Sequence, residues 1–219
     1  MRDISFRCAP PPIRARLLGP VDLRVGDRIL APGAWRRRPA RRILLMLLGT
    51  PGHRLPRDVV LDALWPDHNL DVSLNSLYKV MHTLRRTLQP NLGAGQKSAY
   101  VEIGNDWIAI VPHDGLWVDA DCFEHLVRQE ATGLEFRETL HVALELYRGD
   151  FMVDEPYADW PITRRESLRA ARERAVLNLA RIDLEQGDPL ASLGHLEALL
   201  ADDPASEEAH RSIIRALLA

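Results

Sequence analysis

Hydrophobic and polar positions alternate in short runs near the start of the chain and recur at helical spacing farther along. Residues 13–30 combine Leu and β-branched residues with two breaks, at Gly19-Pro20 and Gly26-Asp27. The second break separates VDLRV from RIL, a pattern typical of a β-hairpin. Short antiparallel strands are therefore predicted here.

Two helices are predicted after these strands. The apolar run Ile43–Leu48 stops at Gly49, and Pro39 ahead of it can occupy a first helical turn. This helix should be short and largely buried. Residues 57–65 predict a second helix, whose apolar positions fit one face and which Pro66 ends.

The segment 73–89 predicts a third helix with two unlike faces. Its apolar positions recur at spacings of three and four, and they are Leu74, Leu77, Met81, Leu84 and Leu88. This stripe should pack the helix against its neighbours, and Asp71 is expected to cap the first turn. The opposite face is polar and is predicted to remain free.

A hairpin is predicted over residues 99–112, around Gly104-Asn105-Asp106. Strands, three helices and a hairpin, in that order, are typical of the winged helix-turn-helix. In that fold the third helix enters the major groove of DNA and the hairpin forms the wing. The first domain is therefore predicted to span residues 13–112.

From about Val118 the pattern changes to helices alone. They are predicted over residues 121–131, 135–148, 162–186, 189–201 and from Ser206 to the end. The last two, joined by DDP, resemble tetratricopeptide-type helix pairs. The predicted fold is an α+β winged helix-turn-helix followed by an all-α tetratricopeptide-like domain over residues 118–219.

Charge divides the chain in the same way. Residues 1–111 contain 17 Lys and Arg against 9 Asp and Glu, whereas residues 112–219 contain 11 against 22. The first part therefore carries a formal charge of +8 and the second −11. A basic module commonly binds a polyanion, and double-stranded DNA is the predicted partner.

The polar face of the segment 73–89 supports this interpretation. No Asp or Glu occurs in this segment, although a merely solvated helix usually mixes both signs. Asn, Lys and Arg read base edges, while Ser, Thr and cationic side chains bind phosphates. The predicted DNA contacts on this helix are Asn75, Ser76, Lys79, His82, Thr83, Arg85 and Arg86. The alternative is an ordinary solvated face.

Further basic residues lie outside this helix. Five arginines lie within residues 36–42. At least one of them, Arg41, is predicted to bind a DNA phosphate; the alternative is that these charges only make the surface soluble. Lys97 precedes the hairpin and is also predicted to bind phosphate. Trp107 could stack on DNA, but an aromatic residue in a short hairpin more often packs against the helices, and that packing is the prediction.

The sequence argues against an enzyme. It contains no HExxH, GxxxxGK[ST], GxGxxG or GxSxG motif, its histidines show no metal-ligand spacing, and no cofactor or metal is expected. Cys8 and Cys122 are expected to be unpaired thiols. Without a long apolar run or a signal peptide, the protein is expected to be cytoplasmic and not membrane-bound.

Several motifs resemble the Streptomyces antibiotic regulatory protein (SARP) family. LLGPVDLRVGDRIL, the LWP and LRR elements and LNSLYKVMHTLRRTLQP are similar to its DNA-binding domain, which is related to the response-regulator winged helices. YRGDF and the helices after it look like the bacterial transcriptional activator domain that follows. The resemblance covers about residues 13–219.

This resemblance implies an activator that binds repeated DNA half-sites as a homodimer and contacts RNA polymerase. It also implies that the chain is a minimal member or a fragment, because the helical domain of the family normally continues. The wing departs from the family, which usually has a Gly-Gly-Tyr-like turn where this chain has Gly104-Asn105-Asp106-Trp107. Asp106 would repel phosphate and oppose insertion of the wing. The alternative function is a protein-interaction scaffold that has lost DNA binding and uses its tetratricopeptide-like helices.

Overall fold

The computed structural model describes residues 10–112, 114–129 and 133–218, so Cys8 and His113 lie outside the described residues. The chain folds into two units. The first comprises the chain up to Arg16 and Val21–Val118, and the second comprises Leu17–Pro20 and Asp119–Ala219. The first unit thus differs from the predicted 13–112 range by including a later strand and leaving out a short internal segment.

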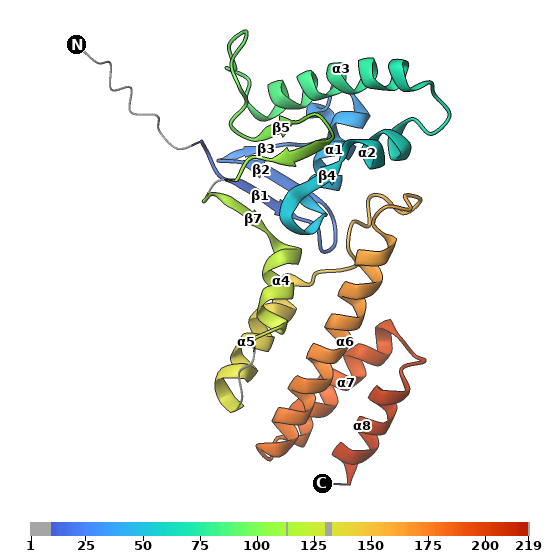
Figure 1. The fold of residues 1–219 in the computed structure, drawn as a ribbon. Coiled ribbons are helices and arrows are strands. Elements are labelled where there is room, and N and C mark those ends of the chain that lie inside the picture. The colour runs from blue at the N-terminus through green and yellow to red at the C-terminus, as the bar shows by residue number, and fades with distance from the viewer. Residues whose placement is uncertain (1–9, 113, 130–132, 219) are drawn as a thin grey trace, which may run out of the picture. The chain divides into compact units, whose positions relative to one another are not determined.

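Alternation of apolar and polar residues produces the first sheet. Strands β1 (Ile13–Arg16) and β2 (Asp22–Val25) pair antiparallel, β3 (Arg28–Ile29) adds to β2, and β7 (Leu116–Val118) pairs parallel to β1. The order is β3-β2-β1-β7 (Figure 1). The short antiparallel strands were predicted, but β7 was not, because three residues are too few for an alternating pattern.

The three predicted helices are present. They are α1 (Arg38–Leu48), α2 (Arg57–Leu64) and α3 (Leu70–Leu88). Pro39 lies in the first turn of α1, as predicted, and all six side chains of Ile43–Leu48 are buried. Each contributes roughly 1.5–3 kcal/mol relative to exposure, which makes α1 the core of this unit.

Helix α3 begins earlier than predicted. Asn69, not Asp71, is its N-cap, and the Asn69 side chain accepts a hydrogen bond from the Asp71 backbone N–H at 3.0 Å. Asn and Asp cap equally well, so the sequence alone did not decide between them. The apolar stripe is buried except for Leu74, which is half-buried, and Val80 joins it.

A second sheet holds the hairpin. Strands β5 (Val101–Ile103) and β6 (Trp107–Ile110) form the predicted hairpin, and β4 (Arg54–Pro56) pairs antiparallel with β6. Strand β4 was not predicted, because three residues between Gly52 and a helix carry no period. It ties the hairpin to the start of α2.

The second unit contains five helices among its described residues. They are α4 (Asp119–Val127), α5 (Gly133–Leu146), α6 (Ile162–Glu185), α7 (Pro189–Asp202) and α8 (Glu207–Leu217). The predicted helix over 121–131 starts two residues earlier and the structure ends it at Val127. Figure 1 shows α6, α7 and α8 as neighbours, and the predicted winged helix followed by a helical domain is confirmed.

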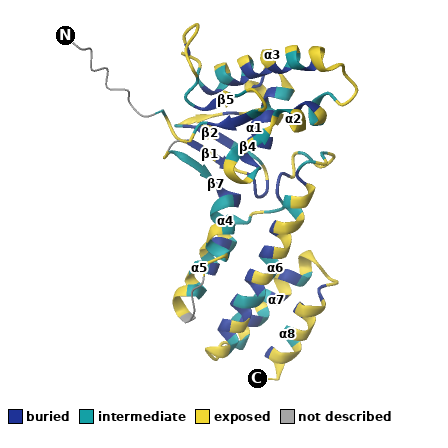
Figure 2. Ribbon diagram, in the orientation of Figure 1, coloured by how far each residue is buried: buried dark blue, intermediate teal, exposed yellow. Residues whose placement is uncertain are grey.

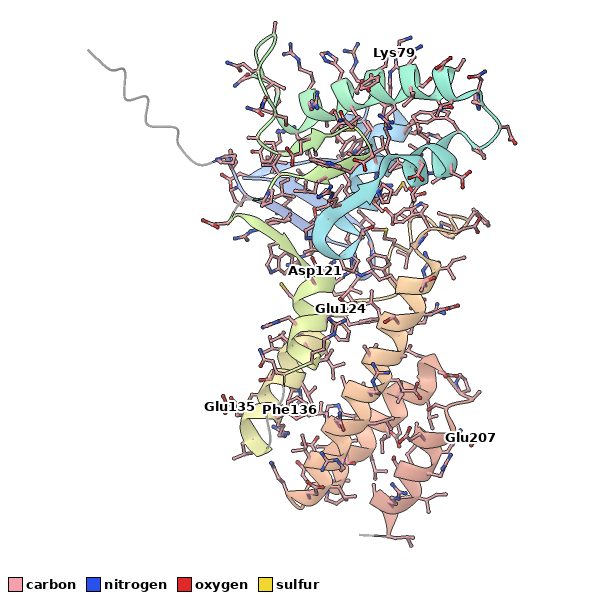
Figure 3. The ribbon with its side chains drawn as sticks, in the orientation of Figure 1. Lys79, Asp121, Glu124, Glu135, Phe136 and Glu207 are labelled. Carbon is pink, nitrogen blue, oxygen red and sulfur yellow. The ribbon has the colours of Figure 1, made fainter. Side chains whose placement is uncertain are left out.

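Helix α6 is central because it buries two faces. One face contributes Val176 and Ala180 to a cluster with α7 and α8, and the other contributes Ala175 and Leu179 to a cluster with α5. Arg164 near its start lies 2.5 Å from Asp121 in α4, the helix on which Figure 3 labels Asp121 and Glu124. Apolar packing and this ion pair together fix the order of the helices.

Asp119 connects the segment 17–20 to the helices of its unit. Its side chain is 1% exposed, and it accepts hydrogen bonds from the backbone N–H groups of Leu17 at 2.7 Å, Leu18 at 3.1 Å and Ala120 at 2.8 Å. Burial raises the pKa of Asp119, and the three N–H donors and Arg148 partly offset that rise. This carboxylate therefore satisfies backbone groups that are more than 100 residues apart in the chain.

A second buried carboxylate joins three helices. Asp183 in α6 is 1% exposed, lies 2.5 Å from Nε of Arg137 in α5, and lies 3.3 Å from Nε2 of His195 in α7. The rings of His195 and His141 are 5.5 Å apart. Burial lowers the pKa of His195 from its ordinary 6.5, and Asp183 opposes this while His141 and Arg137 reinforce it.

His195 should therefore make stability fall as the solution becomes acidic. Because its folded pKa lies below the unfolded value, the unfolded chain binds more protons as pH falls through about 6.5, and unfolding is favoured. On acidification from about pH 7.5 to about 5.5, the melting temperature of the wild type should fall further than that of His195→Gln. Thermal unfolding measured by circular dichroism tests this. The variant His125→Gln, at an exposed histidine, should lose as much melting temperature on acidification as the wild type. An equal loss in all three proteins would show that His195 does not cause the pH dependence.

Candidate nucleic-acid interface

The outer side of α3 carries four of the nine predicted DNA contacts. Asn75, Lys79, His82 and Arg86 are exposed, whereas the opposite side of the helix is buried (Figure 2). Figure 3 shows Lys79 projecting from this outer side. The spacing of these residues follows the helical repeat, so they form one strip along the helix. The strip therefore has the geometry of a helix that can enter a groove.

Three predicted residues on α3 are only half-buried. They are Ser76, Thr83 and Arg85. The Thr83 hydroxyl donates to the backbone carbonyl of Lys79 at 3.0 Å, which leaves its oxygen free only to accept. Nε of Arg85 is buried and has no hydrogen-bond partner among the described residues. These residues lie at the flank of the strip, closer to the body of the unit.

Tyr78 belongs to the same strip and was missed by the sequence prediction. Its side chain is 52% exposed, between Asn75 three positions earlier and His82 four positions later. The spacing was available in the sequence, but an aromatic residue in an amphipathic helix is usually assigned to the apolar side. A phenol here can stack on a sugar or donate its O–H to a phosphate.

A cleft of about 760 Å³ adjoins the second half of α3. Its basic lining residues are His82, Arg85, Arg86 and Lys97. The loop carrying Lys97 also contributes Gln96 and Ser98, and β5 contributes one acid, Glu102. The fold thus brings four of the nine predicted residues to one concave surface, which the sequence could not show because the loop follows α3 by several residues.

Arg41 is placed differently. It is half-buried on α1 and is not among the residues that line the cleft, while Arg36, Arg37 and Arg38 before it are exposed. The structure therefore does not bring Arg41 together with the residues of the cleft. Within the arginine cluster 36–42, the exposed arginines at the start of α1 are therefore more accessible to a phosphate than Arg41.

The wing is held by contacts within the protein. Trp107 is half-buried, and the guanidinium carbon of Arg54 in β4 lies 4.3 Å from the centre of its ring. Gly104 lies so close to the indole that an added Cβ would overlap the ring, and its N–H donates to the Trp107 carbonyl at 2.8 Å. Trp107 was predicted to pack against the helices, but its contact within the protein is with Arg54 of strand β4. Asp106 at the turn is exposed.

The described residues contain no cluster of three or more His, Cys, Asp or Glu side chains that could hold a metal ion. Cys122 is a free thiol. Within the described part of the chain, no helix combines the length and the apolar character that a membrane span requires.

Comparison with known proteins bears on both units. Residues 118–219 match the family model of the bacterial transcriptional activator domain. The fold is similar to that of Mycobacterium tuberculosis EmbR, solved in complex with a low-affinity phosphopeptide, with a TM-score of 0.76 and 20% sequence identity. The match covers 94% of this chain but 54% of that one, so the chain spans about half the length of EmbR. No curated protein sequence matches the chain.

These findings assign the second unit to the bacterial transcriptional activator domain and support a transcriptional regulator as the class of the protein. Its second unit carries the domain found in bacterial transcriptional activators, and its first unit has a winged-helix fold. More narrowly, the predicted resemblance to SARP-type regulators is confirmed by this domain match together with the similar fold.

Proposed function

We propose that the protein binds double-stranded DNA in a sequence-dependent manner through α3 and activates transcription through its second unit. The observation that carries this proposal is the exposed strip of Asn75, Lys79, His82 and Arg86, which adjoins a basic cleft. Asn75 and Lys79 lie toward the N-terminal half of α3, where residues of a recognition helix most often reach base edges. Arg86 and Lys97 lie where a phosphate backbone would pass.

The roles of the individual side chains follow from their donors. Asn75 can form a bidentate pair with adenine, and Lys79 can donate to the acceptors of guanine. Ser76, His82, Thr83 and Arg85 flank these contacts and bind the sugar-phosphate backbone in this proposal. Asp106 keeps the wing turn away from phosphate, so that the loop carrying Lys97 makes the contact beside α3.

The second unit is proposed to contact RNA polymerase and a second copy of the chain. The match to the bacterial transcriptional activator domain supports the first role. A homodimer on repeated half-sites would place two α3 helices on successive turns of the duplex.

DNA binding by the full chain should depend strongly on salt. Each neutralised phosphate lowers log K by about 0.9 per unit of log salt, so about four contacts imply roughly a 100-fold loss of affinity between about 50 and 200 mM salt. Fluorescence anisotropy with duplexes selected from a random pool measures this loss, and the selected sequences give half-site spacing. If no duplex bound at low salt, the scaffold function would replace the proposal.

A further inference from the structure

The face of the first sheet that points away from the core carries an unusual row of side chains. In the pairing register, Arg14 lies opposite Arg24 in β2 and beside Trp117 in β7, while Arg24 lies opposite Ile29 in β3. The row therefore crosses all four strands. Arg16 lies two residues along β1, on the same face.

This row costs stability unless something binds it. Like charges directly opposite each other in an antiparallel pair are destabilising. Arg24 is held by Asp22 at 2.9 Å, but no carboxylate of the described residues pairs with Arg14 or Arg16. Arg14 and Arg16 are both exposed and lie two residues apart, and neither has a carboxylate partner among the described residues.

The arginines line a cleft of about 610 Å³. Every lining residue belongs to the first unit, and the walls include the indole of Trp117 and the side chain of Leu116. Asp22 and Asp114 also lie on the lining, so three arginines face two aspartates. The cleft thus offers hydrogen-bond donors for a few carboxylates beside an apolar wall. Because its charges are mixed, it lacks the uniform positive field that a long polyanion such as a nucleic acid requires.

The cleft and the proposed DNA contacts share no residue. Figure 1 shows α3 and β7 at opposite edges of the first unit, with α1 and β2 between them in this view. None of the cleft residues lies on α3 or on the loop that carries Lys97. A duplex held by α3 therefore leaves this face available to another partner.

We propose that this face docks an extended acidic peptide segment of a partner protein. Residues two apart on a strand are about 7 Å apart, and an extended peptide places every second side chain at the same spacing. Arg14 and Arg16 can thus each take one carboxylate through a bidentate pair. An aliphatic side chain of the peptide packs on Trp117.

The test uses the full chain and a fluorescein-labelled peptide of about ten residues in which Asp alternates with Leu and Ser. Anisotropy should show binding of this peptide and little binding of the version with Asn for Asp. Arg14→Gln combined with Arg16→Gln should weaken binding at least about tenfold, because two ion-paired contacts are lost. The double variant R14K/R16K keeps the positive charges but loses the bidentate guanidinium groups, so its peptide affinity should lie between those of the wild type and R14Q/R16Q.

Matched controls separate this site from general charge and from DNA binding. Arg128→Gln with Arg181→Gln removes two exposed arginines of the second unit and should leave peptide affinity unchanged. The double variant K79A/R86A should also bind the peptide normally. Melting temperatures within about 2 °C of the wild type would show that R14Q/R16Q is folded. Unchanged peptide binding by R14Q/R16Q would overturn the proposal, and so would equal binding of the Asp peptide and its Asn version by the wild type.

Discussion

Replacing Lys79 and Arg86 together with alanine is expected to weaken binding of a selected duplex about 100-fold, or about 2.7 kcal/mol. Lys79 is assigned to a base edge and Arg86 to a phosphate, so sequence preference and salt dependence should change together. The slope of log K against log salt should decrease in magnitude by about one, because one phosphate contact is lost. Anisotropy titrations at several salt concentrations measure both quantities.

Both substitutions are on the exposed side of α3, so the fold should be unaffected. Arg181→Ala with Arg211→Ala removes the same charge from exposed ion pairs of the second unit and should leave duplex affinity within about twofold. If K79A/R86A bound the selected duplex as tightly as the wild type, the assignment of α3 as the reading helix would be wrong.

Asp119→Ala is expected to lower the free energy of unfolding by about 3–5 kcal/mol. The substitution leaves the backbone N–H groups of Leu17, Leu18 and Ala120 without their acceptor, and each buried unsatisfied donor costs about 1–3 kcal/mol. The raised pKa of Asp119 shows that burial opposes its charge, which reduces the net loss below the sum of three donors. Urea denaturation followed by circular dichroism measures the change.

The variant Asp119→Asn serves as a comparison for Asp119→Ala. It retains one acceptor oxygen but turns an amide donor toward one of the N–H groups, so a smaller loss than for alanine is expected. Glu197→Ala removes an exposed acid from the middle of α7 and should stay within about 0.5 kcal/mol of the wild type. If Asp119→Ala unfolded at the same urea concentration as the wild type, these hydrogen bonds would not anchor the segment 17–20.

The candidate DNA contacts were predicted unevenly. The outer side of α3 was predictable because apolar spacing and the absence of acids are both local properties. Tyr78 was missed because an aromatic residue has no fixed side in such a pattern. The cleft forms because the loop after α3 folds back and brings Lys97 to the same cleft as Arg85 and Arg86. The path of that loop cannot be predicted from local sequence periodicity.

The sequence by itself determined the helices, the charge division between the two halves and the order of winged helix and helical domain, because each follows from short-range periods and composition. Only the tertiary structure decided the pairing of β7 with β1, the row through Arg14 and the burial of Asp119. These features join residues about 100 positions apart. Such contacts form where strands meet in register and where buried backbone groups need acceptors, and both conditions arise only in the folded chain.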